Sequence, residues 1–404
     1  MSAVSTTSRP TVSRTAAAPA PPPVTPVDVV GCTVFSTAGQ GLDPIADALL
    51  RGTAAEGGPA GEAAAGDYPP RLDVRSVPGF SPADTLGRKG LGRLTRTDQL
   101  VSVACSLALG ELPEQAAQTE PADTGIVLGT SVGSTGRVGE FIRDTFVQEL
   151  PYFVNPSHFP GILMNSAAGR AAIRLGLTGV NSTVSGGPLA GLHALRFART
   201  ALLAGHARRL LTGAFEELSA QRAWAWHRSG GTAAGVPLGE GGAVFVLQAP
   251  DEHAEGPRPL ARLLACDVGF ADPADGLPGV SRRLADCVRT ALVRSEIAPE
   301  DVAVAAPGAS GRRGWARVEE AALREVFSPA HGPGQPRRLA VQQVLGETDS
   351  ANGALQLAAV LARWQDGRQD TGRERAAVIT SVGPDGSVGC AVVARPSGAP
   401  SPRR

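Results

Sequence analysis

The sequence lacks a net charge, a long apolar run and closely spaced cysteines, and each absence excludes a class of protein. Its 404 residues include 38 Lys and Arg against 38 Asp and Glu, so no net field draws the chain to nucleic acid or to an anionic membrane. No window approaches the run of about 18 apolar residues that a membrane helix needs. We therefore expect a cytoplasmic protein that has neither nucleic acid nor a membrane as a partner.

The cysteines are odd in number, widely scattered and without the close pairs that are typical of zinc sites or disulfide frameworks. We expect each of them to be a small buried hydrophobe in a reducing cytosol. They are Cys32, Cys105, Cys266, Cys287 and Cys390. The sequence therefore gives no reason to expect a metal or a cofactor.

What the sequence does contain is the composition of a globular protein, with 42% hydrophobic and 19% charged residues. The length suffices for about two to three average domains, or for one large duplicated architecture. Residues 1–26 are rich in Ser, Thr, Ala, Pro and Arg and lack acidic side chains. Because they have no amphipathic apolar face, we interpret them as a disordered tail and not as a transit peptide, and residues 397–404 as a second tail.

Strand-like apolar runs alternate with segments of helical spacing along the rest of the chain. The strand-like runs lie at 27–36, 124–134, 207–217, 241–248, 302–310 and 376–382, and the helical segments at 93–112, 189–205 and 354–364. This alternation predicts a largely parallel α/β sheet. Charge and proline at 249–259 indicate a boundary between an N-terminal half, 27–250, and a C-terminal half, 257–396. The halves are compatible with a duplication, although no repeat is visible as sequence identity.

Five segments are similar, in order and in spacing, to those of β-ketoacyl synthases of the thiolase fold. They are the glycine turn GTSVGS at 129–134, the approach to a nucleophile elbow at 164–191, GVPLGEG at 235–241, the last histidine loop and its helix at 341–361, and VGPDGSVG at 382–389. One glycine-rich turn alone is a weak signal, but five in register favour the family. The resemblance implies a thiolase-like fold with a duplicated five-layered αβαβα architecture.

The catalytic residues of that family are missing. Condensation there uses a cysteine thiolate at a helix N-terminus, where the helix dipole favours negative charge. It also uses two histidines that assist decarboxylation and stabilise the oxyanion. Here the matching residues are Pro188 for the nucleophile, Pro307 or Gly308 for the first histidine, Glu347 for the second and Gln342 for a lysine. Because four positions have changed together, the resemblance implies an inactive member of the family.

Three side chains close to these positions each have a catalytic and a structural interpretation. His193 follows Pro188 on the same predicted helix, but a buried core histidine is the favoured interpretation. Ser185 is the nearest hydroxyl to the lost cysteine, and we interpret it as a cap or turn residue. Glu347 is a possible base, but a structural role, such as pairing with a cation to close the empty pocket, is favoured.

Thr135, Val138 and Ile142 follow the GTSVGS turn at the spacing of one helix face. On spacing alone, ordinary core packing is the favoured interpretation. In the chain-length-factor branch of the family, however, the matching helix lines the polyketide tunnel at the heterodimer interface. The resemblance therefore implies a fairly open tunnel here, because these three side chains are of modest size.

Taken together, the resemblance implies a chain length factor, the β-type subunit of a type II polyketide ketosynthase. The implied partners are an active ketosynthase α-subunit, an acyl carrier protein and the growing polyketide chain. Many chain length factors of aromatic pathways carry glutamine where this chain has Pro188, which disfavours a decarboxylase role and leaves a polyene-type system equally compatible. Two alternatives remain open: an acyltransferase that uses Ser185 or Glu347, and a homodimeric scaffold protein.

Overall fold

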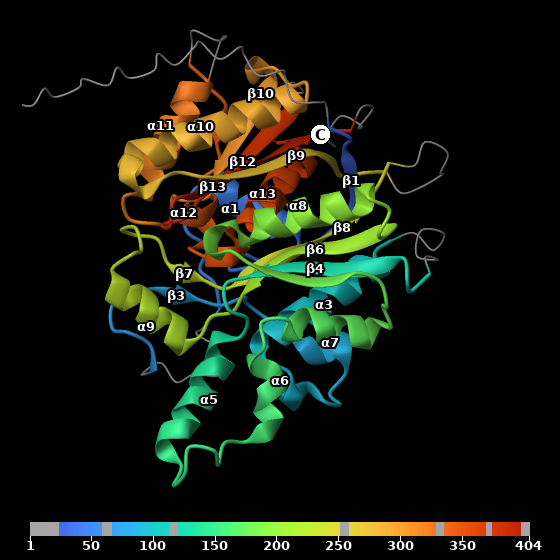
Figure 1. Ribbon diagram of the computed structural model, residues 1–404, viewed down its shortest axis with the longest axis vertical. Helices are drawn as coiled ribbons and strands as arrows, with labels where there is room; N and C mark the ends of the chain where they lie inside the picture. The colour runs from blue at the N-terminus through green and yellow to red at the C-terminus, as the bar shows by residue number, and fades with distance from the viewer. Residues whose placement is uncertain are drawn as a thin grey trace, which may run out of the picture.

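The strands form one mixed sheet that runs through the whole molecule (Figure 1). The computed structural model describes residues 24–58, 67–112, 120–250, 258–328, 335–368 and 374–396. The predicted tails, 1–26 and 397–404, and the middle of the predicted boundary at 249–259 therefore lie largely outside the described residues. In the described part the sheet has eleven strands, in the order β11-β10-β12-β13-β9-β1-β8-β6-β4-β5, with β2 paired to β1.

The two ends of this sheet repeat one strand order. The N-terminal strands are β1 (Val27–Ser36), β4 (Thr124–Thr130), β5 (Asn181–Ser185), β6 (Arg209–Glu216) and β8 (Gly241–Gln248), and they lie in the order β1-β8-β6-β4-β5. The C-terminal strands are β9 (Ala261–Phe270), β10 (Val302–Pro307), β11 (Arg337–Arg338), β12 (Ala376–Val382) and β13 (Ser387–Ala394), in the order β9-β13-β12-β10-β11. Both sets place their first, fifth, fourth, second and third strands side by side, so the fold is duplicated although the sequence repeat is not visible.

The prediction of a largely parallel sheet is wrong. In each half the two strands farthest from the centre are parallel to their neighbours, as in β4 with β5 and β6. The other ladders, such as β1 with β8 and β12 with β13, are antiparallel. A short turn joins β12 to β13, and such a turn can only return the chain antiparallel. Alternating strand and helix signals do not reveal that reversal.

Helices cover both faces of the sheet and fill the space between its halves (Figure 1). The outer layer on the N-terminal half is formed by α3 (Arg96–Gly110) and α7 (Ser166–Leu175), and the outer layer on the C-terminal half by α10 (Gly276–Arg294) and α11 (Trp315–Val326). Between the half-sheets lie α8 (Ala190–Leu203) and α13 (Asn352–Asp366). These are the five layers αβαβα that the resemblance implies.

The remaining elements connect these layers. They are β2 (Gly39–Gln40), α1 (Leu42–Arg51), β3 (Val74–Arg75), α2 (Pro82–Leu86), α5 (Thr135–Val147), α6 (Phe159–Ile162), α9 (Ala220–Ser229), β7 (Leu238–Gly239) and α12 (Val341–Leu345). The helices α5 and α6 project from the body as an arm (Figure 1). Among the described residues, no helix combines the length and the apolar character that crossing a membrane requires.

The central helix α13 shows why the layers are stable. All its residues from Asn352 to Trp364 are buried, and a helix that is buried on every side has to lie inside the protein. Its first turn touches the first turn of α8, where a Cβ on Gly191 would lie 3.1 Å from the backbone nitrogen of Ala354. The start of α8 in turn lies against the end of β4, because a Cβ on Gly129 would be 2.5 Å from the Ala190 carbonyl oxygen.

The Gly129 contact can be tested by substitution. We expect Gly129→Ala to lower the free energy of unfolding by about 1–3 kcal/mol, because the new methyl group would overlap the backbone of Ala190. The control is Gly169→Ala on α7, where a Cβ meets nothing within 4 Å and alanine favours the helix by about 0.5–1 kcal/mol. Urea titration of the full chain measures both. Equal effects of the two changes would contradict this account of the packing.

Candidate functional site

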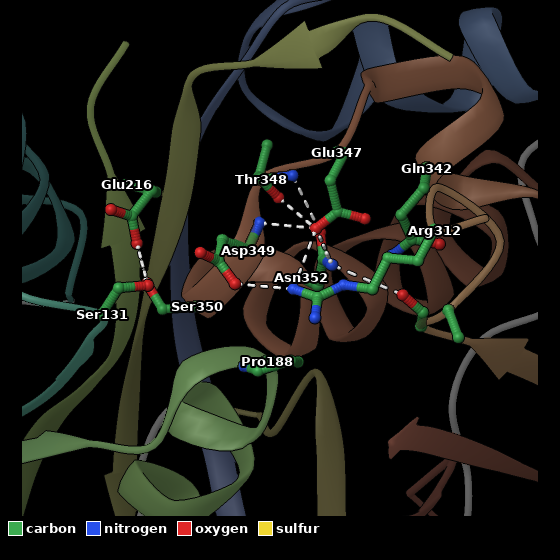
Figure 2. Close-up of polar contacts among 12 residues, drawn as sticks. Ser131, Pro188, Glu216, Arg312, Gln342, Glu347, Thr348, Asp349, Ser350 and Asn352 are labelled. Atoms are coloured by element: carbon green, nitrogen blue, oxygen red, sulfur yellow. Dashed lines mark hydrogen bonds and ion pairs between the residues drawn. The ribbon is translucent and has the colours of Figure 1, made fainter. Parts of the chain in front are cut away.

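The fold brings the residues predicted to match the family's catalytic positions together near the first turns of the two central helices. Pro188 lies in the turn Gly187–Leu189, between β5 and α8. This turn contacts β12, the first turn of α13 and the segment Asp349–Ala351 that precedes α13. Pro307 ends β10, and Glu347 lies between α12 and α13. Figure 2 shows Pro188 facing the polar cluster around Glu347.

Glu347 is fully buried, and its carboxylate is the centre of that cluster (Figure 2). Its Oε1 atom accepts hydrogen bonds from Asn352 Nδ2 at 2.8 Å and from the Asp349 backbone N–H at 2.8 Å. The same Asn352 amide group reaches the Gly308 carbonyl oxygen at 3.4 Å. One asparagine therefore links the two loops that were predicted to match the family's histidine loops.

Arg312 neutralises this buried charge. Its Nη2 atom lies 2.6 Å from Asp349 Oδ1 and 3.4 Å from Glu347 Oε1. Burial by itself lowers the pKa of the Arg312 guanidinium, but the two carboxylates outweigh burial and raise that pKa above its ordinary value. The guanidinium also lies 5.2 Å from the centre of the Trp226 ring, a cation–π contact. Arg312 is therefore a permanent cation inside the site.

The backbone around the ion pair is shaped to accept it. Asp349 has φ 51, a left-handed conformation that is uncommon outside glycine. Gly311 allows the Glu347 carboxylate to approach, because a Cβ there would lie 2.5 Å from Glu347 Oε2. Gly346, the glycine that the family also has, has φ 86 and faces the Pro237 carbonyl oxygen. A side chain at either glycine would displace the loop.

The other predicted positions have structural contacts. Pro188 offers neither a nucleophile nor an N–H, and its carbonyl oxygen accepts from Ser381 Oγ at 3.0 Å. Gln342 lies on α12, and its Oε1 atom accepts from Ser310 Oγ at 2.9 Å. The Gly308 N–H donates to Glu319 Oε1 at 3.1 Å. No group of three His, Cys, Asp or Glu side chains is arranged for a metal ion in the part of the chain that the structure describes.

Ser185 and His193 lie at the edge of the site. The Ser185 hydroxyl donates to the Ser131 carbonyl oxygen at 2.7 Å. The His193 ring packs on Gly186, where a Cβ would meet its Cδ2 atom at 2.8 Å. His193 is half-buried, not a core histidine as predicted. Burial, with the nearby Arg196 charge, lowers its pKa, while Asp385 opposes the shift.

The sequence reasoning missed several buried charged residues that surround the site. They are Glu216, Glu217, Arg222, Glu240, Arg312 and Glu319. Glu216 accepts from Ser131 Oγ at 2.9 Å and from the hydroxyl of Ser350 (Figure 2). Glu240 is bound by Arg96 through two hydrogen bonds of 2.9 and 2.7 Å. The signal in the sequence is slight. Glu216 and Glu240 directly follow an apolar or small strand residue, and Arg312 lies in a glycine-rich loop.

The predicted tunnel residues lie on α5, in the arm. Ser134 caps this helix by accepting the Arg137 N–H at 3.3 Å. Thr135 and Val138 are half-buried and Ile142 is 50% exposed, and α5 has no buried residue. The interpretation of these residues as ordinary core packing is therefore wrong. All the cysteines are free. Four are buried, as expected, and Cys32 is half-buried.

Comparison with protein families gives the class of this chain. A model of the β-ketoacyl synthase N-terminal domain matches residues 25–253, more than half of the sequence. The chain also has 32% identity and a TM-score of 0.74 to the ishigamide ketosynthase/chain length factor, over 92% of this chain and 99% of that one. This chain belongs to the β-ketoacyl synthase family.

Other relatives of the chain include proteins of polyketide synthases. The tetracenomycin polyketide synthase ketoacyl synthase beta subunit of Streptomyces glaucescens is 35% identical over 136 residues, which are 33% of this chain and 32% of that protein. The match therefore spans about a third of that relative. A putative polyketide β-ketoacyl synthase 2 of Streptomyces virginiae is 27% identical over 66% of this chain and 69% of its own length. A β-ketoacyl synthase from Burkholderia phymatum shares the fold, with a TM-score of 0.76 and 20% identity.

The ion pair makes a prediction about stability. We expect Glu347→Gln to lower the free energy of unfolding by about 2–3 kcal/mol, because Arg312 would keep only Asp349 as a partner inside the protein. The matched change Glu325→Gln breaks the exposed pair with Arg289 and should have an effect of less than about 1 kcal/mol. Urea denaturation measures both. A loss below about 1 kcal/mol for Glu347→Gln would show that the pair does not hold the site.

Glu216 makes a prediction about pH. Burial raises its pKa to about 7, with Arg222 opposing the shift and Asp349 adding to it. Because the folded pKa lies above the ordinary value of 4.5, this group's contribution to stability is fully present below that value and is lost as the pH rises through about 7. We expect Glu216→Gln to reduce the fall in Tm between pH 5 and pH 8, measured by calorimetry. An unchanged or steeper fall would contradict this.

Proposed function

We propose that this chain is a non-condensing subunit that pairs with an active ketosynthase and shapes the tunnel into which a polyketide chain grows. The observation that carries the proposal is the ion pair of Arg312 with Glu347 and Asp349, at 3.4 and 2.6 Å. Glu347 in this ion pair stands at the position that the resemblance matches to the family's second histidine. A site occupied by a permanent cation and its counter-charges has no neutral base to supply.

The chemistry of the remaining groups supports the same conclusion. Condensation requires an acceptor for the acyl chain, and Pro188 has no side-chain atom that can form a thioester. A base needs a free lone pair directed at the substrate. Glu347 Oε1 is already engaged by three donors. Within the described part of the chain Oε2 has no hydrogen-bond partner, but it lies against Gly311 in a carboxylate that is fully buried, where it is not exposed to a substrate.

The arm supports pairing with a second subunit. Large apolar side chains are exposed on it and on the loop that joins its helices: Phe146 82%, Tyr152 72%, Phe153 53%, Phe159 53% and Met164 49%. A concentration of exposed apolar residues is typical of an interaction surface. The strand β5 is also the edge of the sheet, and it follows the arm and α7 along the chain. Both features are open to a partner.

We propose an active ketosynthase of the same fold as that partner, because the solved relative with 32% identity is described as a ketosynthase/chain length factor. Thr135, Val138 and Ile142 would then line the tunnel beside the interface. The acyl carrier protein would deliver the growing chain to the active subunit. A solved neighbour of the same fold is described as a type II acyl carrier protein in complex with its ketosynthase bound to the hexaketide.

Co-expression of this chain with a candidate active ketosynthase tests the proposal. We expect the two chains to co-purify, and the ketosynthase to be inactive or insoluble when expressed alone. A homodimer of this chain beside a ketosynthase that is active alone would favour a scaffold protein. Acylation of this chain by a loaded carrier protein, detected by intact mass, would favour an acyltransferase. Either result would overturn the proposal.

The interface can be tested by one substitution in the arm. We expect Phe153→Asp to weaken the heterodimer by about 30-fold or more, because it puts a charge into a desolvated apolar contact. Val293→Asp is the control, since Val293 is similarly exposed, at 57%, but lies on α10 on the opposite side of the sheet. Analytical ultracentrifugation of co-expressed chains measures both. Equal weakening by the two changes would exclude the arm as the interface.

A further inference from the structure

One buried carboxylate, that of Glu217, holds the N-termini of two helices. Its Oε1 atom accepts from the Gly136 N–H at 2.8 Å, in the first turn of α5. Its Oε2 atom accepts from the Thr97 N–H at 3.2 Å and from the Thr97 hydroxyl at 2.9 Å, in the first turn of α3. The Ser134 hydroxyl lies 3.0 Å from both oxygens. Glu217 thereby joins the arm to the body.

The charge of Glu217 is what makes it suited to this position. The first N–H groups of a helix have no partner within the helix, and the dipole there favours an anion. Burial raises the pKa of Glu217, and the hydrogen bonds from Gly136, Thr97 and Ser134 oppose that shift. Each carboxylate oxygen serves one helix. A neutral side chain with one oxygen could serve only one of them.

The face of α5 that meets the body carries glycines, so the helix lies close to Glu217 and Gln221. A Cβ on Gly136 would lie 3.2 Å from Glu217 Oε1, and a Cβ on Gly139 would lie 2.5 Å from Gln221 Cγ. On a helix, Thr135 and Val138 directly neighbour these glycines. A shift of the first turn of α5 therefore moves the two predicted tunnel residues by a similar distance.

The backbone of Glu217 is tied to the degenerate site. The Arg222 guanidinium donates to the carbonyl oxygen of Glu217 at 3.2 Å and to that of Glu347 at 3.0 Å. The same guanidinium donates to the Gly239 carbonyl oxygen at 2.8 Å. The anchor of α5 is thus held by the same buried polar cluster that replaced the catalytic residues.

We propose that Glu217 is a positioning residue that sets the width of the polyketide tunnel through the first turn of α5. The inference rests on the proposed function, because it requires that α5 line a tunnel beside an active partner. According to this inference, a buried charge that does not touch the polyketide contributes to setting the length of the polyketide. The substrate class is the growing poly-β-ketone, whose length is limited by the space beside Thr135 and Val138.

The test is the product of the full heterodimer. We expect Glu217→Gln to leave heterodimer formation intact and to change the ratio of longer to shorter products by about threefold or more, since tunnels and pockets discriminate single added units on this scale. The amide group can accept from Gly136 or from Thr97, but not from both. Mass spectrometry of products and the size of the purified complex are the two readouts.

The matched control is Glu319→Gln. Glu319 is equally buried, and its carboxylate accepts from the Gly308 and Ala309 N–H groups at 3.1 and 2.7 Å, but it lies in the C-terminal half and contacts no part of the arm. We expect unchanged product lengths for this variant. A product shift of the same size would show that the effect is a general loss of stability, which would overturn the inference.

A milder variant keeps the inference testable if Glu217→Gln does not fold. Ser134→Ala removes one donor to Glu217 and the cap of α5, and should shift product lengths in the same direction by a smaller factor. Intact heterodimers with unchanged product lengths for either variant would overturn the inference. Failure of the unmodified chain to pair with a ketosynthase would instead overturn the proposed function.

Discussion

The contact between α8 and α13 is the constraint on which the rest of the structure depends. These helices lie between the half-sheets and meet at Gly191 and Ala354, where no side chain separates their backbones. Pro188 shortly precedes α8, and Glu347 shortly precedes α13. The contact therefore brings residues from distant parts of the chain to one place. The residues predicted to match the family's catalytic positions are thereby gathered around the starts of α8 and α13.

The charged groups in and around this site compensate one another. A buried carboxylate without a partner is strongly unfavourable. Glu347 has Arg312, Glu240 has Arg96, and Glu217 has the N-termini of two helices. Arg222 connects the site around Glu347 to Glu217, which holds the arm. Electrostatic contacts between buried groups thus link the site to the arm on which the proposed function depends.

Sequence reasoning predicted the elements well where the signal is local. The runs predicted at 27–36, 241–248 and 376–382 are strands β1, β8 and β12. It could not predict strand direction, because direction depends on how β12 and β13 are joined. It also missed Arg312, whose partner Glu347 is 35 residues away. For α5, spacing alone favoured core packing, although no residue of that helix is buried. Helical spacing shows which residues share a face, but not what that face meets.

The sequence by itself determined the family, because the family is read from residue types at fixed spacings. The prediction that the nucleophile, the two histidines and the lysine are replaced, by Pro188, by Pro307 or Gly308, by Glu347 and by Gln342, also needs no coordinates. Only the tertiary structure decided what occupies the site in their place, because the pairing of Glu347 with Arg312 and the two-helix anchor at Glu217 join segments that are distant in sequence. Contacts of that kind depend on the packed layers, and no local pattern encodes them.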